Sequence, residues 1–563
     1  MATSSHLAGA SQPESSGLPT GLYFVVGWQV IFGLGCVYAA SQILQIERIF
    51  NLGNFVQIFL AALLALISVA GFASAYLIYR VNGSGRLIGM GMNIIAMILT
   101  LMYLGHIIGL YTGLDGLADG LYESINWLLG IAIGYAVYWV SQRLPAKSSA
   151  RLWVSRAGVA IMLLSLAITF IVSGLLVNGV SALVSGIMRL DSLVVLAVAA
   201  AFGAAAYFLL RQGTFFGETV AERDTWQGWL FLMPNFINFT LFFAGPLLLS
   251  LYLSFTDYNP AQQDPARFLG VGNYASMLSL STGTLTSPDQ PVNQILAQNH
   301  AEVARITVGS DTVVIGARDP LFWRSFFNTI FYCINLLILS IPPALGLAML
   351  LNSKMPGMKF FRAVFFIPSI AAVVGVALIW QWLYDPTIGY INYAISSVVN
   401  GINSLLGAAI TNPEIQWLTD ERILMLSVVI MSAWQVIGFN TVILLAGLQG
   451  IPKELVEASY VDGAGRWTRF RKIILPLLGP TTFFVTITTL IAGLQAFAEP
   501  FSLIGENNPT TAKLTSVYYL YNQGFTSFRM GYASAVAWVV FIAIFIVTVI
   551  QFRLSSSNQA YAD

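Results

Sequence analysis

A charged segment that begins at Ile451 reads IPKELVEASYVDGAGRWTRFRKIILPLLGP and lies between two long apolar stretches. Acidic side chains occupy its first half, and its second half holds four basic ones, Arg466, Arg469, Arg471 and Lys472. No Ser/His/Asp or Cys/His grouping stands out in the chain, so no covalent chemistry is indicated. The chemistry available to this segment is recognition of another protein by a short, presented helix.

The local pattern predicts a helix, a turn and a second helix. Pro452 suits a first helical turn, where its missing N–H costs nothing, and Glu457 lies near the positive end of that helix. Gly463 can adopt the left-handed conformation that ends helices. A second helix is expected over Trp467–Ile474, and Pro476 should then stop or kink the chain. An ordinary loop, basic because of membrane topology, is the alternative.

The composition is that of an integral membrane protein. Of the 563 residues, 57% are hydrophobic and 9% are charged, whereas a soluble domain has about 25% charged residues. The net charge of +1 provides no basic field for nucleic acid. Cys36 and Cys333 lie in apolar stretches and are interpreted as small hydrophobic side chains, so neither a disulfide framework nor a metal site is predicted.

Apolar stretches of about 20 residues, the length that crosses a bilayer, recur along the chain and predict an all-α membrane protein with about 12 transmembrane helices. Membrane-spanning strands are excluded because the alternating pattern of a membrane barrel is absent. The predicted spans are 21–45, 55–79, 87–111, 125–142, 157–177, 191–210, 228–254, 325–351, 361–384, 423–446, 479–498 and 531–551.

The distribution of Lys and Arg orients these spans, because basic residues favour cytoplasmic loops. With 451–478 on the cytoplasmic side, most of the 26 basic residues are cytoplasmic, and so are both termini. The acidic loop 112–124 is then outside. Residues 1–20 are rich in Ser, Gly and Pro and contain no Lys or Arg, which predicts a disordered cytoplasmic tail rather than a signal peptide.

Three further segments fall on the outside. The largest, about 256–324, is a polar extracytoplasmic insertion, and the other two are 385–422 and 499–529. Within the insertion, Ile306–Val308 and Thr312–Ile315 flank a turn sequence, Gly309-Ser310-Asp311, which predicts a β-hairpin.

The spans contain almost no ionisable side chains. His106 is the exception, with Asp191 at a helix edge. Ionisable residues at bilayer depth usually mark ion pathways, so their scarcity argues against an ion-coupled carrier. No GxxxxGK[ST] sequence is present either, which argues against ATP binding by that loop in this chain. If the chain moves a solute, the energy must come from another protein.

Glu457-Ala458-Ser459, Gly463 and Ile474-Leu475-Pro476 resemble the EAA signature of ABC-importer permeases, in which E-A-A-x-x-x-G is followed after nine residues by I-x-L-P. Ser459 replaces the second Ala of that pattern. Further segments resemble the permeases of maltose-type sugar importers over about 225–553. These are Ala446–Pro452, Trp229–Asn235, Leu251–Tyr258, Phe268–Tyr274, Trp323 with Asn328-Thr329, and Arg362–Pro368.

The resemblance implies a six-helix permease core within 212–563 and a place in a prokaryotic plasma membrane. It implies a second permease subunit, an ATPase dimer that binds ATP and Mg²⁺, and an extracytoplasmic solute-binding protein, with no cofactor in this chain and no enzymatic activity of its own. The implied ATPase-coupling residues are Glu457, Ala458, Ser459, Asp462, Gly463 and Pro476. The resemblance does not cover 1–211. The six-helix membrane region 21–211 has an unknown role, and dimer contact, lipid packing and fused regulation are the alternatives.

A pathway without charges suits a neutral solute such as a sugar, which aromatic faces and polar edges bind. The candidate pathway residues are Trp434, Gln435, Gly438, Asn440 and Gln495, with Trp380 and Trp382 as further candidates. Interfacial anchoring of Trp and hydrogen bonding of Asn or Gln between helices are the alternatives. For the whole chain, the alternative function is a membrane scaffold or sensor that docks a cytoplasmic partner without transport.

Overall fold

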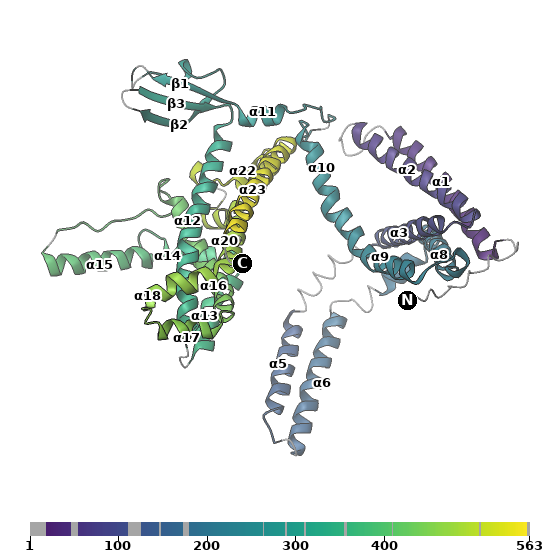
Figure 1. Cartoon of the computed structure of the whole chain (residues 1–563), viewed down its shortest axis with the longest axis horizontal. Helices are drawn as coiled ribbons and strands as arrows, with labels where there is room; N and C mark the ends of the chain where they lie inside the picture. Colours follow the sequence, from purple (N-terminus) through teal and green to yellow (C-terminus); the bar gives the residue numbers. More distant parts are fainter. Residues whose placement is uncertain are drawn as a thin grey trace, which may run out of the picture. The chain divides into compact units, whose positions relative to one another are not determined.

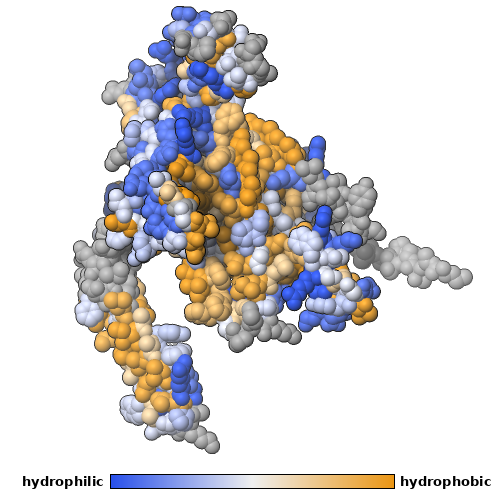
Figure 2. Space-filling model, turned by 90° about the vertical axis from the view of Figure 1, so that its left-hand side faces the viewer, coloured by the Kyte–Doolittle hydropathy of each residue, from blue (hydrophilic) through white to orange (hydrophobic). Residues whose placement is uncertain are grey.

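The computed structural model describes residues 18–46, 54–110, 125–145, 148–172, 180–262, 264–285, 287, 290–308, 311–353, 357–407, 409–505 and 508–559. The chain packs as two compact units. The first ends at Ala244, and the second begins at Gly245. Helices dominate both units, as Figure 1 shows, and apolar side chains cover much of the surface that Figure 2 presents. The predicted tail 1–20 lies almost wholly outside the described residues, as does the acidic loop 112–124.

Within its described residues, the first unit contains helices and the turns between them, and no strand. Its helices are α1 (Thr20–Gln45), α2 (Asn54–Tyr79), α3 (Gly83–Ile107), α5 (Ile125–Ser141), α6 (Ser149–Val172), α7 (Val180–Ile187), α8 (Leu190–Arg211) and α9 (Val220–Phe239). Helix α1 packs on α2 and α8, α3 packs on α2 and α8, and α5 packs on α6. The α5–α6 contact is close at Gly134, where an added Cβ would lie 2.8 Å from the carbonyl oxygen of Gly158. The small residue thus allows α5 and α6 to approach each other closely.

A buried ion pair joins three helices of the first unit. The Arg86 guanidinium lies 2.9 Å from the Glu218 carboxylate, and the two side chains are 3% and 11% exposed. Arg86 also donates to the Leu209 carbonyl at 2.7 Å, near the end of α8 where helical carbonyls lack partners. Trp226 on α9 donates its indole N–H to Glu218. The pair therefore connects α3, the end of α8 and the start of α9.

The second unit contains the remaining spans. A π-helical turn at Thr240–Ala244 precedes α10 (Gly245–Ser254), and the longer helices are α12 (Pro320–Leu351), α16 (Leu424–Gln449), α20 (Gly479–Leu494) and α23 (Met530–Gln559). Shorter elements are α11 (Gly272–Leu278), α13 (Met358–Ile370), α14 (Val373–Leu383), α15 (Tyr390–Leu406), α17 (Lys453–Val461), α18 (Arg466–Arg469), α19 (Leu475–Leu477), α21 (Ala498–Ile504) and α22 (Ser516–Tyr521).

Within the described residues, nine helices are long and apolar enough to cross a membrane, or up to eleven when each bent pair counts as one span. The remaining predicted span, 125–142, is the shorter helix α5. The prediction of one unbroken span over 361–384 is wrong, because α13 and α14 meet at an angle of 99°. Pro368 lies at that break, and Gln435 donates to the Ala371 carbonyl at 2.9 Å, so the interrupted backbone keeps a partner.

The predicted insertion contains a small antiparallel sheet in the order β1-β3-β2. Its strands are β1 (Leu280–Leu285), β2 (Ala301–Val308) and β3 (Asp311–Ala317). The β2–β3 pairing confirms the predicted hairpin, although the turn residues 309 and 310 lie outside the described residues. Strand β1 was not predicted, because its sequence LSTGTL lacks the alternation of apolar and polar residues that marks a strand.

The segment 499–529, predicted as an outside loop, is largely buried in the second unit. Tyr518 is fully buried and packs in one cluster with Phe322 and Val536. Asn328 donates to the Leu514 carbonyl at 3.0 Å, which ties the segment to α12. The short helices of this segment carry no long apolar stretch, so the sequence indicated the segment's side of the membrane and did not predict its burial.

We predict that Arg86→Ala lowers the free energy of unfolding by about 3 kcal/mol, because removing one partner of a buried pair leaves the other charge uncompensated. Arg151→Ala removes an exposed hydrogen bond to Gln142 and should cost less than about 0.5 kcal/mol. Thermal unfolding of the full chain in detergent at pH 7 measures both. Equal effects of the two substitutions would contradict a structural role for the pair.

The same pair predicts an acid-dependent loss of stability. Burial by itself raises the pKa of Glu218, but hydrogen bonds from Arg86 and Trp226 and the charges of Arg86 and Arg223 outweigh it, so the pKa lies below its ordinary value of 4.5. The contribution of the ion pair to the free energy of unfolding is therefore full above about pH 4.5 and is lost as the pH falls through the lowered pKa of Glu218. Unfolding midpoints from pH 7 to 3 should fall more steeply in the native chain than in Glu218→Gln.

Candidate functional site

The 451–478 loop folds as the predicted helix, turn and second helix. Helix α17 begins after Pro452 and ends at Val461, and Gly463 has a left-handed φ of 71°. The Gly463 N–H donates to the Tyr460 carbonyl at 3.1 Å, and the Ala464 N–H donates to the Ser459 carbonyl at 2.9 Å. These two bonds form a Schellman motif, which satisfies the last carbonyls of α17 and fixes where the chain turns.

A buried arginine holds the two halves of the loop together. The Arg469 Nε donates to the Ser459 hydroxyl at 3.0 Å, and another guanidinium nitrogen donates to the Ala464 carbonyl at 3.1 Å. The guanidinium also lies over the Tyr460 ring, 3.4 Å from its centroid. Ser459 and Arg469 are both buried. The hydroxyl that distinguishes this chain from the Glu-Ala-Ala pattern is therefore a hydrogen-bond acceptor within the loop.

The second half of the loop continues directly into a membrane helix. After α18, residues 470–474 form a π-helical turn, and α19 contains Pro476. The chain then bends by 68° at Leu478 before α20 begins. Leu478 is fully buried in a cluster with Leu444 of α16 and Val485 of α20. The predicted kink after the second helix is confirmed, and it lies against the helices on either side.

The outer surface of the loop is exposed among the residues that the structure describes. Glu457 and Ala458 are exposed on α17, as is Asp462 at its end. Val461 is 89% exposed and Trp467 is 70% exposed. An exposed acid beside large exposed apolar side chains, on a helix whose ends are fixed, is suited to docking in a groove of another protein.

A cavity of about 280 Å³ lies inside the second unit, between α13, α14, α16, α20 and α21. Two predicted pathway residues, Gln435 and Asn440, line it. Asn440 is 1% exposed and donates to the Thr489 hydroxyl of α20 at 3.1 Å. The other lining residues are Ser369, Val373, Val436, Phe439, Thr488, Thr489, Ala492 and Glu499.

The other predicted pathway residues lie outside that lining. Trp434 is half-exposed with its ring 5.8 Å from that of Trp380. Gly438 allows α16 to approach α13, because a Cβ there would collide with the carbonyl of Phe365. Gln495 is exposed at the end of α20. Trp382 is exposed at the end of α14.

Glu499 is a cavity residue that the sequence did not single out. It lies in the first turn of α21, one residue beyond the predicted end of the span 479–498. Burial raises the pKa of its carboxyl. The sequence does contain a signal for it. Outside the 451–478 loop, Glu499 is the one acidic residue between 424 and 505, and acidic residues are rare at membrane depth.

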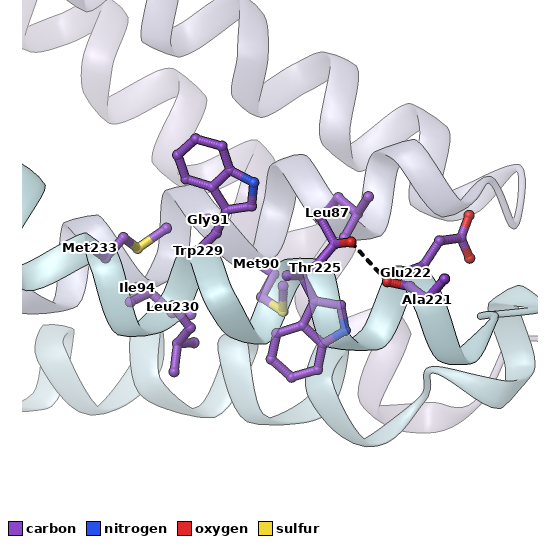
Figure 3. A pocket seen from close by; sticks show the side chains of 11 residues that line it. Leu87, Met90, Gly91, Ile94, Ala221, Glu222, Thr225, Trp229, Leu230 and Met233 are labelled. Atoms are coloured by element: carbon purple, nitrogen blue, oxygen red, sulfur yellow. Dashed lines mark hydrogen bonds between the residues drawn. The ribbon is translucent and has the colours of Figure 1, made fainter. Parts of the chain in front are cut away.

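Two further features of the first unit do not form a reactive site. A groove of about 470 Å³ is lined by residues of α3 and α9. Trp229 and Met233 are among the lining residues that Figure 3 labels. The walls of the groove are mainly apolar, and the hydrogen bond drawn there is a local one from Thr225 to the Ala221 carbonyl. His106 is exposed on α3 beside Tyr103.

Comparison with known proteins identifies the second unit. Residues 313–558 match the family described as "Binding-protein-dependent transport system inner membrane component". The arabinooligosaccharides transport system permease protein AraP of Bacillus subtilis (strain 168) is 30% identical over 330 residues, which are 58% of this chain and 88% of the relative. This chain belongs to that family. It is the membrane permease component of an ABC importer.

Other similar proteins are also named as parts of transport systems. The lactose transport system permease protein LacF of Rhizobium radiobacter is 27% identical to this permease over 336 residues, or 59% of this chain and 95% of LacF. The crystal structure of a bacterial ABC transporter involved in import of the acidic polysaccharide alginate aligns with a TM-score of 0.44 at 19% identity, covering 60% of this chain and 96% of that chain. The match at 313–558 contains both the 451–478 loop and the cavity.

We predict that Gly463→Ala weakens the end of α17 by about 1 to 2 kcal/mol, because an L side chain is strained at positive φ. Gly465→Ala is the matched control. Both glycines face open space, but Gly465 has a φ of −64°, which any residue adopts. Hydrogen exchange of the α17 amides should accelerate about tenfold in the first variant and stay unchanged in the second. Equal exchange in both would contradict the proposed helix end.

Proposed function

We propose that this permease forms one side of the pathway of an ATP-driven importer and that α17 receives the force which opens and closes it. The observation that carries the proposal is a continuous connection from the exposed face of α17 to the cavity. Three residues separate the end of α16 from the start of α17, and the second half of the loop runs directly into α20. A displacement of the loop is therefore applied to two walls of the cavity at once.

The two walls are themselves joined. Asn440 of α16 and Thr489 of α20 form a buried hydrogen bond at the cavity. Because this bond lies between the two helices that the loop connects, it makes them move together. The Arg469 contacts keep the loop from absorbing the displacement, since its two halves cannot separate without breaking a buried charged hydrogen bond.

The proposed substrate is a sugar or oligosaccharide. AraP and LacF are named for arabinooligosaccharide and lactose transport. The cavity offers neutral hydrogen-bonding groups from Gln435, Asn440 and Thr488 together with the Phe439 ring, a combination that suits hydroxyl edges and an apolar sugar face. Glu499 is the charged group in the lining, so a neutral solute is favoured over an anionic one.

The proposed partners follow from the same arrangement. An ATPase subunit that binds ATP and Mg²⁺ would receive α17, with Glu457 paired to one of its basic side chains. A second permease subunit would complete the pathway, and a solute-binding protein would deliver substrate on the face opposite the 451–478 loop. In the orientation proposed here, the loop and both termini are cytoplasmic. The first unit has no assigned role in transport.

We predict that Glu457→Ala lowers both substrate-stimulated ATP hydrolysis and uptake at least tenfold in the reconstituted importer, because it removes a charge from the docking face. Glu454→Ala, a change of the same kind one turn earlier on α17, should lower them less than threefold. Unimpaired uptake in Glu457→Ala would overturn the coupling role. Failure of any reconstituted mixture to import solute would favour a scaffold or sensor instead.

We predict that Asn440→Ala lowers the number of solute molecules imported per ATP hydrolysed, because α20 no longer follows α16. Thr489→Val should have a similar effect, and the double variant should be no worse than either single one, since all three remove the same bond. Paired measurements of uptake and phosphate release in proteoliposomes give this ratio. Independent, multiplying losses would show that the two residues act separately.

A further inference from the structure

Helix α15 is a 17-residue helix without a single charged side chain. Successive residues of a helix are 100° apart around its axis, and at that spacing the apolar residues of α15 all fall on one half of its surface. They are Ile391, Ala394, Ile395, Val398, Val399, Ile402, Leu405 and Leu406. The opposite half carries Asn, Ser, Tyr and Gly residues. The helix is therefore amphipathic along its full length of about 25 Å.

The second unit leaves most of this apolar half uncovered. Val398 is 62% exposed, Leu405 is 85% exposed and Leu406 is 77% exposed. Ile391 alone of the apolar set packs against the main cluster of the second unit. In Figure 1, α15 extends away from α14 and α16 rather than lying across them. An apolar face of this size is too costly to leave in water and requires a covering surface.

Polar contacts fix α15 at both ends. Near its start, Asn392 donates to the Ile415 carbonyl at 3.0 Å and accepts from the Trp417 indole N–H at 2.8 Å. Near its end, Asn403 donates to the Ile410 carbonyl at 2.9 Å and accepts from the Ile410 N–H at 3.0 Å. The returning chain is thus held by two residues of the polar half, and the apolar half keeps no comparable contact apart from Ile391 within the described residues.

The neighbouring residues indicate what covers that side. Helix α14, part of a bent membrane span, contacts α15 and exposes Leu378, Ile379 and, at its end, Trp382. Tyr390 and Tyr393 follow at the start of α15 and are also exposed. Aromatic residues at the end of a span mark the level of the lipid headgroups. The apolar face of α15 thus continues the surface by which α14 meets the bilayer.

We propose that α15 lies in the membrane interface, at the end of α16 opposite the 451–478 loop, with its apolar half inserted among lipid acyl chains. The occupant of this face is the lipid surface itself. Because α15 carries no Lys or Arg, its insertion depends on apolar area and not on anionic headgroups. The Asn392–Trp417 contact then connects a membrane-anchored helix to the start of α16, and so holds that end of a cavity wall at a fixed depth.

The test uses fluorescence quenching in the full chain. Cys36 and Cys333, both buried, are replaced by alanine. Single cysteines, Val398→Cys and Leu405→Cys on the apolar half and Asn400→Cys and Ser404→Cys on the polar half, are labelled with an environment-sensitive fluorophore. The protein is reconstituted in phosphatidylcholine vesicles with or without a nitroxide at carbon 5 of the acyl chain, and aqueous iodide is the second quencher.

The proposal expects nitroxide lipid to quench labels at 398 and 405 at least threefold more strongly than those at 400 and 404, with the opposite order for iodide. Adding 30 mol% anionic lipid, or raising the salt concentration, should leave this pattern unchanged. Iodide quenching of 398 and 405 as strong as that of 400 would overturn the proposal. Protection of 398 and 405 from both quenchers would also overturn it, because a protein would then cover the face. Neither result depends on whether the chain transports solute.

Discussion

The contact on which the account depends is that of the buried Arg469 guanidinium with Ser459, Ala464 and Tyr460. A loop between two membrane helices would ordinarily be the most pliable part of such a protein, because few apolar contacts hold it. Here a charge-assisted hydrogen bond inside the loop, a cation–π contact and a Schellman turn give it one conformation. A rigid loop can transmit a displacement, whereas a pliable one would dissipate it.

The rigid loop lies between two helices that line the cavity. It connects α16 to α20, and these two helices also meet through the Asn440–Thr489 hydrogen bond at the cavity. Two helix breaks lie close to these features. The bend between α13 and α14 lies at the cavity, and the bend at Leu478 lies between the loop and α20. Broken helices are tolerated at membrane depth where protein surrounds the interrupted backbone or where it lines a water-filled cavity. Here Gln435 supplies a partner to the Ala371 carbonyl.

The sequence predicted those features that local rules determine. Hydropathy located the spans, Gly463 marked the end of α17, and the β-branched runs around residues 309–311 marked the β2–β3 hairpin. What it missed depends on tertiary contacts. The break between α13 and α14 lies within an unbroken apolar stretch, and Glu499 reaches the cavity only because α21 packs against α14 and α16. Trp434 and Gly438 were reasonable pathway candidates by type, but packing around α16 gives them other neighbours.

The central claim is that the exposed face of α17 transmits force from an ATPase to the cavity walls. The most direct measurement is a density map of the assembled importer with nucleotide bound. The account predicts that Val461 and Trp467 are buried in a groove of the ATPase subunit, with the Glu457 carboxylate beside a basic side chain. A map in which α17 contacts only water, in an assembly that hydrolyses ATP and imports solute, would contradict it.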